Sequence, residues 1–291
     1  MRSWISLAGL LIVVTALAAW VYYKPKPESK TAHALSALRP AVVKRAQLER
    51  ISAATATAAA TSITLERTDD AWRVTAPWLA RADKFQVERL LSILQAYSSV
   101  RYPATELARF GLDRPLAVLT ADDHTFAFGA INNTTREQYV MTRNEVYLVA
   151  LTYGAALPRN ADALLARQLL APGEIPVRFD LPGFTVALED GTWAVAPAVP
   201  DLSADDRNAW VDAWRNASAM SVTRQDSAAT AQNIKIVLKD GRTLDIGIIK
   251  GEPELILRRA DEGVQYLFVA EIAKRLMSPP GASRVSDAVK K

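Results

Sequence analysis

The feature that most constrains the fold of this chain is an internal repeat of long period. In its first part, ITLERTDDAWRVTAP is matched by FTVALEDGTWAVAP, so that Trp72 falls on Trp193 and Pro77 on Pro197. Three segments recur in the same order and at nearly constant spacing: 63–77 with 184–197, 116–129 with 234–247, and 146–149 with 266–269. Such a repeat indicates that one structural unit occurs twice in tandem.

Each copy has the same expected order of elements. Alternating apolar residues on either side of Asp-Asp or Asp-Gly pairs predict β-hairpins, because Asp-Gly is a strong signal for a two-residue turn. A helix is predicted to begin at Asp83, with Gln86 three residues on, and another at Ser203, with Asp206. The sequence therefore predicts an α+β fold of two tandem diverged repeats, each an antiparallel sheet with a helix packed on one face.

An uncharged apolar run precedes the repeats. Residues 4–23 contain no charged side chain, and aromatic residues lie at both ends of the run. At about 1.5 Å per residue, a helix of this length spans about 30 Å, the thickness of the hydrocarbon core of a bilayer. The run predicts a single transmembrane helix; the alternative is a cleaved signal peptide with its cleavage site at residues 16–18.

The predicted domain boundaries follow from these two features. We expect an anchor, a linker, a first module, a second module and a tail, at 1–23, 24–40, 41–172, 173–279 and 280–291 respectively. An expected helix at about 162–170 closes the first module.

Composition excludes several classes of function. The chain has no cysteine, which excludes disulfides, thiolate nucleophiles and a lipoprotein anchor. Its net charge is +4, but seven Lys or Arg and two Glu lie within residues 24–50, beside the apolar run. The basic excess is thus placed to meet anionic lipid rather than spread over a folded face, which argues against nucleic-acid binding.

Candidate sites are few, and each has a structural alternative. Asp122, Asp123 and His124 could hold a metal, but Asp-Gly stands at the corresponding place in the second copy, which favours a turn. No catalytic, cofactor or metal site is therefore predicted. Trp78 has no counterpart, follows a proline and lies in an expected loop, so it is the one candidate contact for a partner; the alternative is simple packing.

The order of four short motifs resembles a known family. WRVTAP (72–77), the helix start at 82–83, FGLDRP (110–115) and FAFG (126–129) resemble the domain-of-unknown-function family 4340, with Phe110 where its members usually have tyrosine. The resemblance implies a bacterial protein with an N-terminal anchor and a periplasmic domain. Some relatives look like accessory subunits of ABC-type transport or gliding systems, and the family supplies no catalytic residues.

Together these features predict a non-enzymatic binding or assembly module accessory to a membrane complex. The expected location is the bacterial inner membrane, held through residues 4–23, with the soluble part in the periplasm and another envelope or membrane protein as partner. One alternative is a cell-envelope enzyme or small-ligand binder using a pocket between the two modules. Another is a purely structural spacer.

Overall fold

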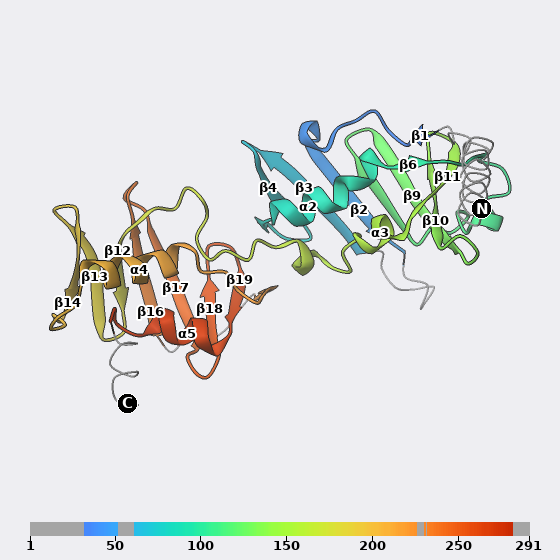
Figure 1. Ribbon diagram of the computed structural model, residues 1–291. Helices are drawn as coiled ribbons and strands as arrows, with labels where there is room; N and C mark the ends of the chain where they lie inside the picture. Colours follow the sequence, from blue (N-terminus) through green and yellow to red (C-terminus); the bar gives the residue numbers. More distant parts are fainter. Residues whose placement is uncertain (1–31, 52–60, 226–229, 231, 282–291) are drawn as a thin grey trace, which may run out of the picture.

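The fold consists mainly of β-strands. The computed structural model describes residues 32–51, 61–225, 230 and 232–281, and these form nineteen strands in three antiparallel sheets. The smallest sheet pairs β1 (His33–Ala34) with β6 (Tyr97–Ser98). The two larger sheets lie beside each other and are joined by the segment before residue 176 (Figure 1). We call these two sheets, with the helices on them, the first and second units.

The first unit contains a nine-stranded sheet. In spatial order its strands are β5 (Ala80–Arg81), β4 (Ala71–Ala76), β3 (Thr61–Thr68), β2 (Arg45–Arg50), β8 (Ala117–Ala121), β9 (His124–Asn132), β10 (Glu137–Thr142), β11 (Glu145–Ala150) and β7 (Arg101–Pro103). Short turns join β3 to β4, β8 to β9 and β10 to β11, which is why these neighbours pair as hairpins.

The second unit contains an eight-stranded sheet of the same topology. Its spatial order is β14 (Thr192–Ala196), β13 (Phe184–Glu189), β12 (Pro176–Leu181), β16 (Gln232–Leu238), β17 (Thr243–Lys250), β18 (Leu255–Arg259), β19 (Val264–Phe268) and β15 (Ser221–Arg224). Trp72 on β4 and Trp193 on β14 are both buried at corresponding places. The two sheets differ at one edge, because β5 has no counterpart in the second.

Most of the short helices lie on one face of each sheet, and η3 lies on the other face of the first. The helices are η1 (Pro40–Val42), α2 (Lys84–Leu91), η2 (Ser92–Gln95), η3 (Leu107–Phe110), α3 (Leu151–Ala155), η4 (Ala161–Leu164), α4 (Ala204–Arg215) and α5 (Ala270–Met277). Asp83 and Ser203 cap α2 and α4 as expected, and each accepts a hydrogen bond of 3.1 Å from the backbone N–H three residues on. On α4, Trp210 and Trp214 pack around Phe179 of β12, with ring centroids 5.2 and 5.6 Å away.

The predicted α+β class is wrong. Strands dominate the described residues, and the longest α-helix there, α4, has only 12 residues. The helix expected at about 162–170 is a single turn, η4, because the backbone that follows it pairs with other segments: Leu165 bridges to Ala82 and Gln168 to Ser218. The alternation of apolar and polar residues that is typical of strands therefore determined the architecture more strongly than the helical patterns between the hairpins.

The predicted anchor and location also need correction. In the described part of the chain, no helix is long and apolar enough to cross a membrane. The run at 4–23 lies outside the described residues. The structure thus does not support a transmembrane helix ahead of the repeats, and we retain neither the inner-membrane nor the periplasmic location.

The first sheet also carries an apolar cluster on its other face. Phe110, Leu112, Ala127 and Val146 are buried together there. Phe110, the first residue of the FGLDRP motif, ends η3, and the chain then turns at Gly111, whose φ of +64° is one that glycine adopts without strain. This turn lays residues 110–112 directly across β9 at Gly129.

Replacing Gly129 by alanine should destabilise the first unit. An added Cβ would collide with the carbonyl oxygen of Phe110 and lie 2.9 Å from Cγ of Leu112. We expect a loss of about 1–3 kcal/mol in the free energy of unfolding, measured by urea titration. Gly173→Ala is the matched control, because its added Cβ would meet nothing within 4 Å and should change stability little. Equal effects of the two substitutions would contradict the close approach at Gly129.

Candidate functional site

The two units are joined by a connecting segment whose backbone is bonded to both. The N–H of Ala166 donates to the carbonyl oxygen of Arg81 at 3.0 Å, on the first unit. The N–H of Leu169 donates to the carbonyl oxygen of Ala217 at 2.9 Å, on the second unit. The apolar core is also continuous across this junction, through Leu165 and Leu169 among others. The junction is therefore a packed interface and not a free linker.

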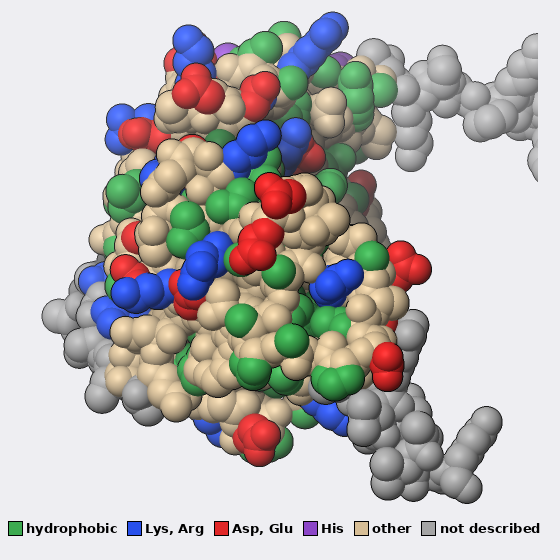
Figure 2. Space-filling view, turned by 90° about the vertical axis from the view of Figure 1, so that its left-hand side faces the viewer, with side chains coloured by type: hydrophobic (Ala, Val, Ile, Leu, Met, Phe, Trp, Pro, Cys, Tyr) green, Lys and Arg blue, Asp and Glu red, His purple; other side chains and the backbone are tan. Residues whose placement is uncertain are grey.

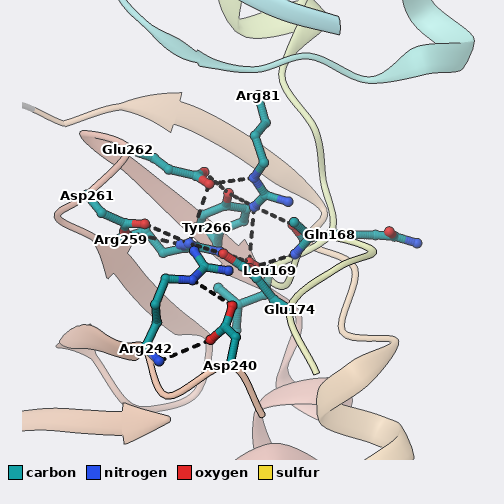
Figure 3. Close-up of polar contacts among 11 residues, drawn as sticks. Arg81, Gln168, Leu169, Glu174, Asp240, Arg242, Arg259, Asp261, Glu262 and Tyr266 are labelled. Carbon is teal, nitrogen blue, oxygen red and sulfur yellow. Dashed lines mark hydrogen bonds and ion pairs between the residues drawn. The ribbon is translucent and has the colours of Figure 1, made fainter. Parts of the chain in front are cut away.

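Arg81, on β5, reaches from the first unit into the second (Figure 3). Its guanidinium forms an ion pair with Glu262 and donates to the hydroxyl of Tyr266 at 2.8 Å. It also donates to the carbonyl oxygens of Gln168 and Leu169, at 2.9 and 3.0 Å. Tyr266 in turn donates to Glu262 at 2.8 Å. These contacts fix the edge of the first sheet against the β18–β19 hairpin.

Arg259, on β18, is the most deeply buried charge of the junction, with 1% of its surface exposed. It donates two hydrogen bonds to Glu174, at 2.7 and 2.9 Å, and two to Asp261, at 2.6 and 3.2 Å. It also donates to the carbonyl oxygen of Leu169 at 2.7 Å. A guanidinium that makes paired bonds of this kind compensates for the loss of water more fully than a single contact would.

The arginines control the protonation of their partners. Burial by itself would raise the pKa of Glu174, but the hydrogen bonds from Arg259 and from the backbone N–H of Ala171 outweigh it and hold that pKa below 4.5. The pKa of Asp261 is likewise lowered, since its bond to Arg259 outweighs its partial burial. Burial raises the pKa of the Tyr266 hydroxyl, which therefore stays protonated at neutral pH. Groups held in one protonation state in this way are structural rather than suited to acid–base catalysis.

The acidic turns singled out in the sequence lie elsewhere and are structural. Asp122 has φ +50°, and its carboxylate accepts hydrogen bonds from the backbone N–H groups of Lys44 and Arg45 at 3.1 and 2.9 Å. Asp123 contacts the ring of His124 at 2.6 Å in the same exposed turn. Within the residues described, no three His, Asp or Glu side chains are grouped as metal ligands would be.

Trp78 lies between the two units. Its ring is half-buried against the apolar core, and the guanidinium of Arg224, from β15 of the second unit, lies 5.0 Å from the ring centroid. Its indole N–H is buried and finds no acceptor among the described residues. The predicted role of Trp78 in contacting another protein stays a prediction, but inside the chain this residue already joins the two units.

A cleft of 550 Å³ opens beside the junction. Its walls are formed by Trp72, Ala82, Ala166 and neighbouring apolar groups from the first unit and the connecting segment. Four basic residues, Arg73, Arg81, Lys84 and Arg167, line it as well, and Arg81 is already paired with Glu262. Phe85, whose surface is 78% exposed, also lines it. Asp70 and Asp83 also line it, but Asp70 pairs with Arg67 and Asp83 caps α2.

A pocket between the two modules was one alternative in the sequence analysis, but the buried ionic cluster beside it was not expected. One signal was present: in LILRR (255–259), strict alternation puts Arg259 on the same face of the strand as Leu255 and Leu257. A charge at a core position needs a partner. The partner, Glu174, lies far away in the sequence and in a segment without pattern, so the pair could not be assigned.

The described chain is thus a mostly β protein whose two large sheets share one topology, with a cleft beside their junction. The family model for a domain of unknown function (DUF4340) matches residues 72–209, as the order of motifs predicted, and this part of the chain belongs to that family. The match runs from β4 across the junction into α4, so it contains most of the cleft. The chain matches none of the curated proteins and none of the solved structures with which it was compared.

Removing Arg259 should destabilise the junction strongly. Arg259→Met leaves the buried carboxylate of Glu174 without its partner, which costs about 3–5 kcal/mol in comparable pairs. Arg242→Met is the matched control, because Arg242 pairs with Asp240 on the surface and should contribute no more than about 1 kcal/mol. Urea unfolding of the two variants measures both values. Similar losses in the two would show that burial of Arg259 does not matter.

The two carboxylates bound by Arg259 should make the stability of the chain depend on pH. Glu174 and Asp261 have lower pKa values in the folded chain than their ordinary values of 4.5 and 3.8, so they bind fewer protons when folded. Their contribution to the free energy of unfolding is complete above pH 4.5 and is lost as the pH falls through their lowered pKa values in the folded chain. We expect the urea midpoint to fall on acidification below pH 4.5, and to fall less steeply in Arg259→Met. Parallel curves for the two proteins would contradict this assignment.

Proposed function

We propose that this protein is a non-enzymatic binding or assembly module, accessory to a membrane complex, and that its junction cleft receives an acidic, partly apolar segment of a partner protein. The observation that carries the proposal is the lining of the cleft. Apolar walls offer burial to an apolar side chain, while Arg73, Lys84 and Arg167 offer charge complementarity to carboxylates.

The balance of paired and unpaired charge supports this reading. The acidic groups of the cleft are engaged inside the chain: Asp70 with Arg67, and Asp83 with the N-terminus of α2. Across the described residues, neither Arg73 nor Arg167 has an acidic side chain within ion-pair distance. Lys84 has one acidic neighbour, Glu88, at the long distance of 3.9 Å. The cleft therefore carries uncompensated positive charge.

The exposed position of Phe85 supports a protein partner. Phe85 lies on the first turn of α2, at the cleft, with most of its surface in water, so a partner bound in the cleft would gain by burying it. Aromatic and arginine side chains together are typical of the residues that contribute most to binding at protein interfaces. The ion pair and hydrogen bonds of Arg81 hold the walls in place, so little conformational freedom is lost on binding.

The family resemblance suggests what kind of complex the partner belongs to. Relatives that look like accessory subunits of ABC-type transport or gliding systems would use such a cleft to hold a segment of a neighbouring subunit. The partner itself is defined here only by its chemistry: a chain segment with carboxylates next to an apolar side chain.

A photo-crosslinking amino acid at position 85 tests the proposal. Placed at Phe85 and irradiated in the native host, it should produce one discrete adduct with another polypeptide. The same probe at Tyr97, which is also an exposed aromatic but lies away from the cleft, is the control and should produce none. Adding Arg167→Glu to the Phe85 probe should reduce the adduct severalfold. No adduct, or the same adduct from both positions, would refute the proposal.

A second candidate is a binder of a small anionic ligand, because a volume of 550 Å³ lies in the range of small-molecule sites. In that case the Phe85 probe would produce no protein adduct. An anionic small molecule would instead co-purify with the chain and be lost in Arg167→Glu, as mass spectrometry of the denatured sample would reveal.

A further inference from the structure

The outer edge of the second sheet is open where the first sheet is covered. In the first unit the chain leaves β4 and returns at once as β5, which pairs with it at Arg73 and Val74. The N–H of Ala82 then donates to the carbonyl oxygen of Trp72 at 2.9 Å. In the second unit the chain leaves β14 and passes through 197–203 to α4, and the described residues place no strand beyond β14.

The open backbone groups can be named from the register. Glu189 and Thr192 flank the two-residue turn of β13 and β14, so Thr192, Ala194 and Ala196 exchange their hydrogen bonds with β13. The N–H and C=O groups of Trp193 and Val195 consequently point away from the sheet. They correspond to those of Trp72 and Val74, which β5 covers in the first unit.

The side chains of β14 do nothing to protect this edge. Exposed edges normally carry charges, prolines or bulges that prevent pairing with another chain. Among the edge strands of the two large sheets, β5 carries Arg81, β7 carries Arg101 and Pro103, and β15 carries Arg224. The sequence of β14, TWAVA, has neither charge nor proline. Where β4 has Arg73, β14 has Ala194.

We propose that β14 pairs antiparallel with β14 of a second copy of this chain, so that two eight-stranded sheets become one continuous sheet about a two-fold axis at Ala194. In this register Trp193 of each copy lies opposite Val195 of the other. All four open groups on each strand then find a partner, with four hydrogen bonds in total. The proposal goes beyond the cleft, which lies on other elements.

A second copy fits this edge because the strand is complementary to itself. The residues on the axis form a non-hydrogen-bonded pair, whose Cα atoms approach to about 4.5 Å, and two alanine methyl groups fit this separation. On the helix side, Trp193 would meet Val195, which extends the apolar layer that both already join. No charge lies on the strand to oppose its own copy, and isologous pairing of this kind is the commonest symmetry of dimers.

The place of β14 in the molecule also suits a second copy. It is the outermost strand, on the side of the second unit away from the first (Figure 1). Leu188 and Val199, beside the edge, are 41% and 37% exposed. Figure 2 faces this end of the molecule, where hydrophobic side chains lie between separated charged groups. A partner could therefore approach without meeting the first unit.

Charge substitutions at the axis test the proposal. The full chain, kept in a mild detergent, should sediment as a dimer. Ala194→Lys and Ala194→Glu each place two like charges in contact across the axis and should weaken the dimer by about tenfold or more. An equimolar mixture of the two variants should restore a dimer, and native mass spectrometry should find one copy of each.

Ala187→Lys is the matched control. Ala187 is also half-buried, lies on the same face as Ala194 and pairs with it, but it is one strand inward from the edge, so its charge should leave the dimer intact. Circular dichroism checks that each variant keeps its strands. A wild-type chain that remains monomeric, including one whose edge takes a strand of another protein, overturns the proposal. So does a dimer that both Ala194 variants leave unchanged.

Discussion

Two arginines from different units donate to one carbonyl oxygen, that of Leu169. Arg81 approaches it from the first sheet at 3.0 Å and Arg259 from the second at 2.7 Å. A carbonyl oxygen has two lone pairs, so one backbone atom of the connecting segment can accept from both. Glu174, Asp261 and Glu262 then balance the two positive charges. The position of the second sheet relative to the first, and with it the cleft, depends on this arrangement.

Much of the architecture could be predicted from local sequence. The recurrence of Trp72 at Trp193 and the caps at Asp83 and Ser203 locate equivalent hairpins and helices, because turn and cap chemistry acts over a few residues. The predicted α+β fold class was wrong because short helical patterns were interpreted as helices large enough to form a layer of the fold. Residues 165–170 show the reason: their backbone groups pair with distant partners, which no local pattern reveals.

For a related reason, the charged residues of the candidate site could not be predicted from local sequence. Its charges come from β5, the connecting segment and the β18–β19 hairpin, and none of them recurs in the other copy. Arg81 corresponds to a loop position ahead of Ser203, and Arg259 takes the place of the apolar Val140 on β10. A repeat identifies what the two copies share, whereas a junction is made from what they do not share. Residues without a counterpart, including Trp78, are therefore the ones to examine first in a chain of this kind.

The packing of residues 110–112 across Gly129 gives the first sheet an apolar cluster on its outer face, where the second sheet has charged side chains. The central strands of the first sheet lie between helices on one face and the cluster of Phe110 and Leu112 on the other. On the second sheet, the corresponding face carries Arg178, Asp180 and Lys235. Opening β9 must therefore disrupt an apolar cluster on each face, whereas the described residues that meet the outer face of β17, such as Thr230 at Gly247, form no such cluster. Amide hydrogens of β9 should exchange with solvent more slowly than those of β17, although the two strands occupy the same place in the repeat.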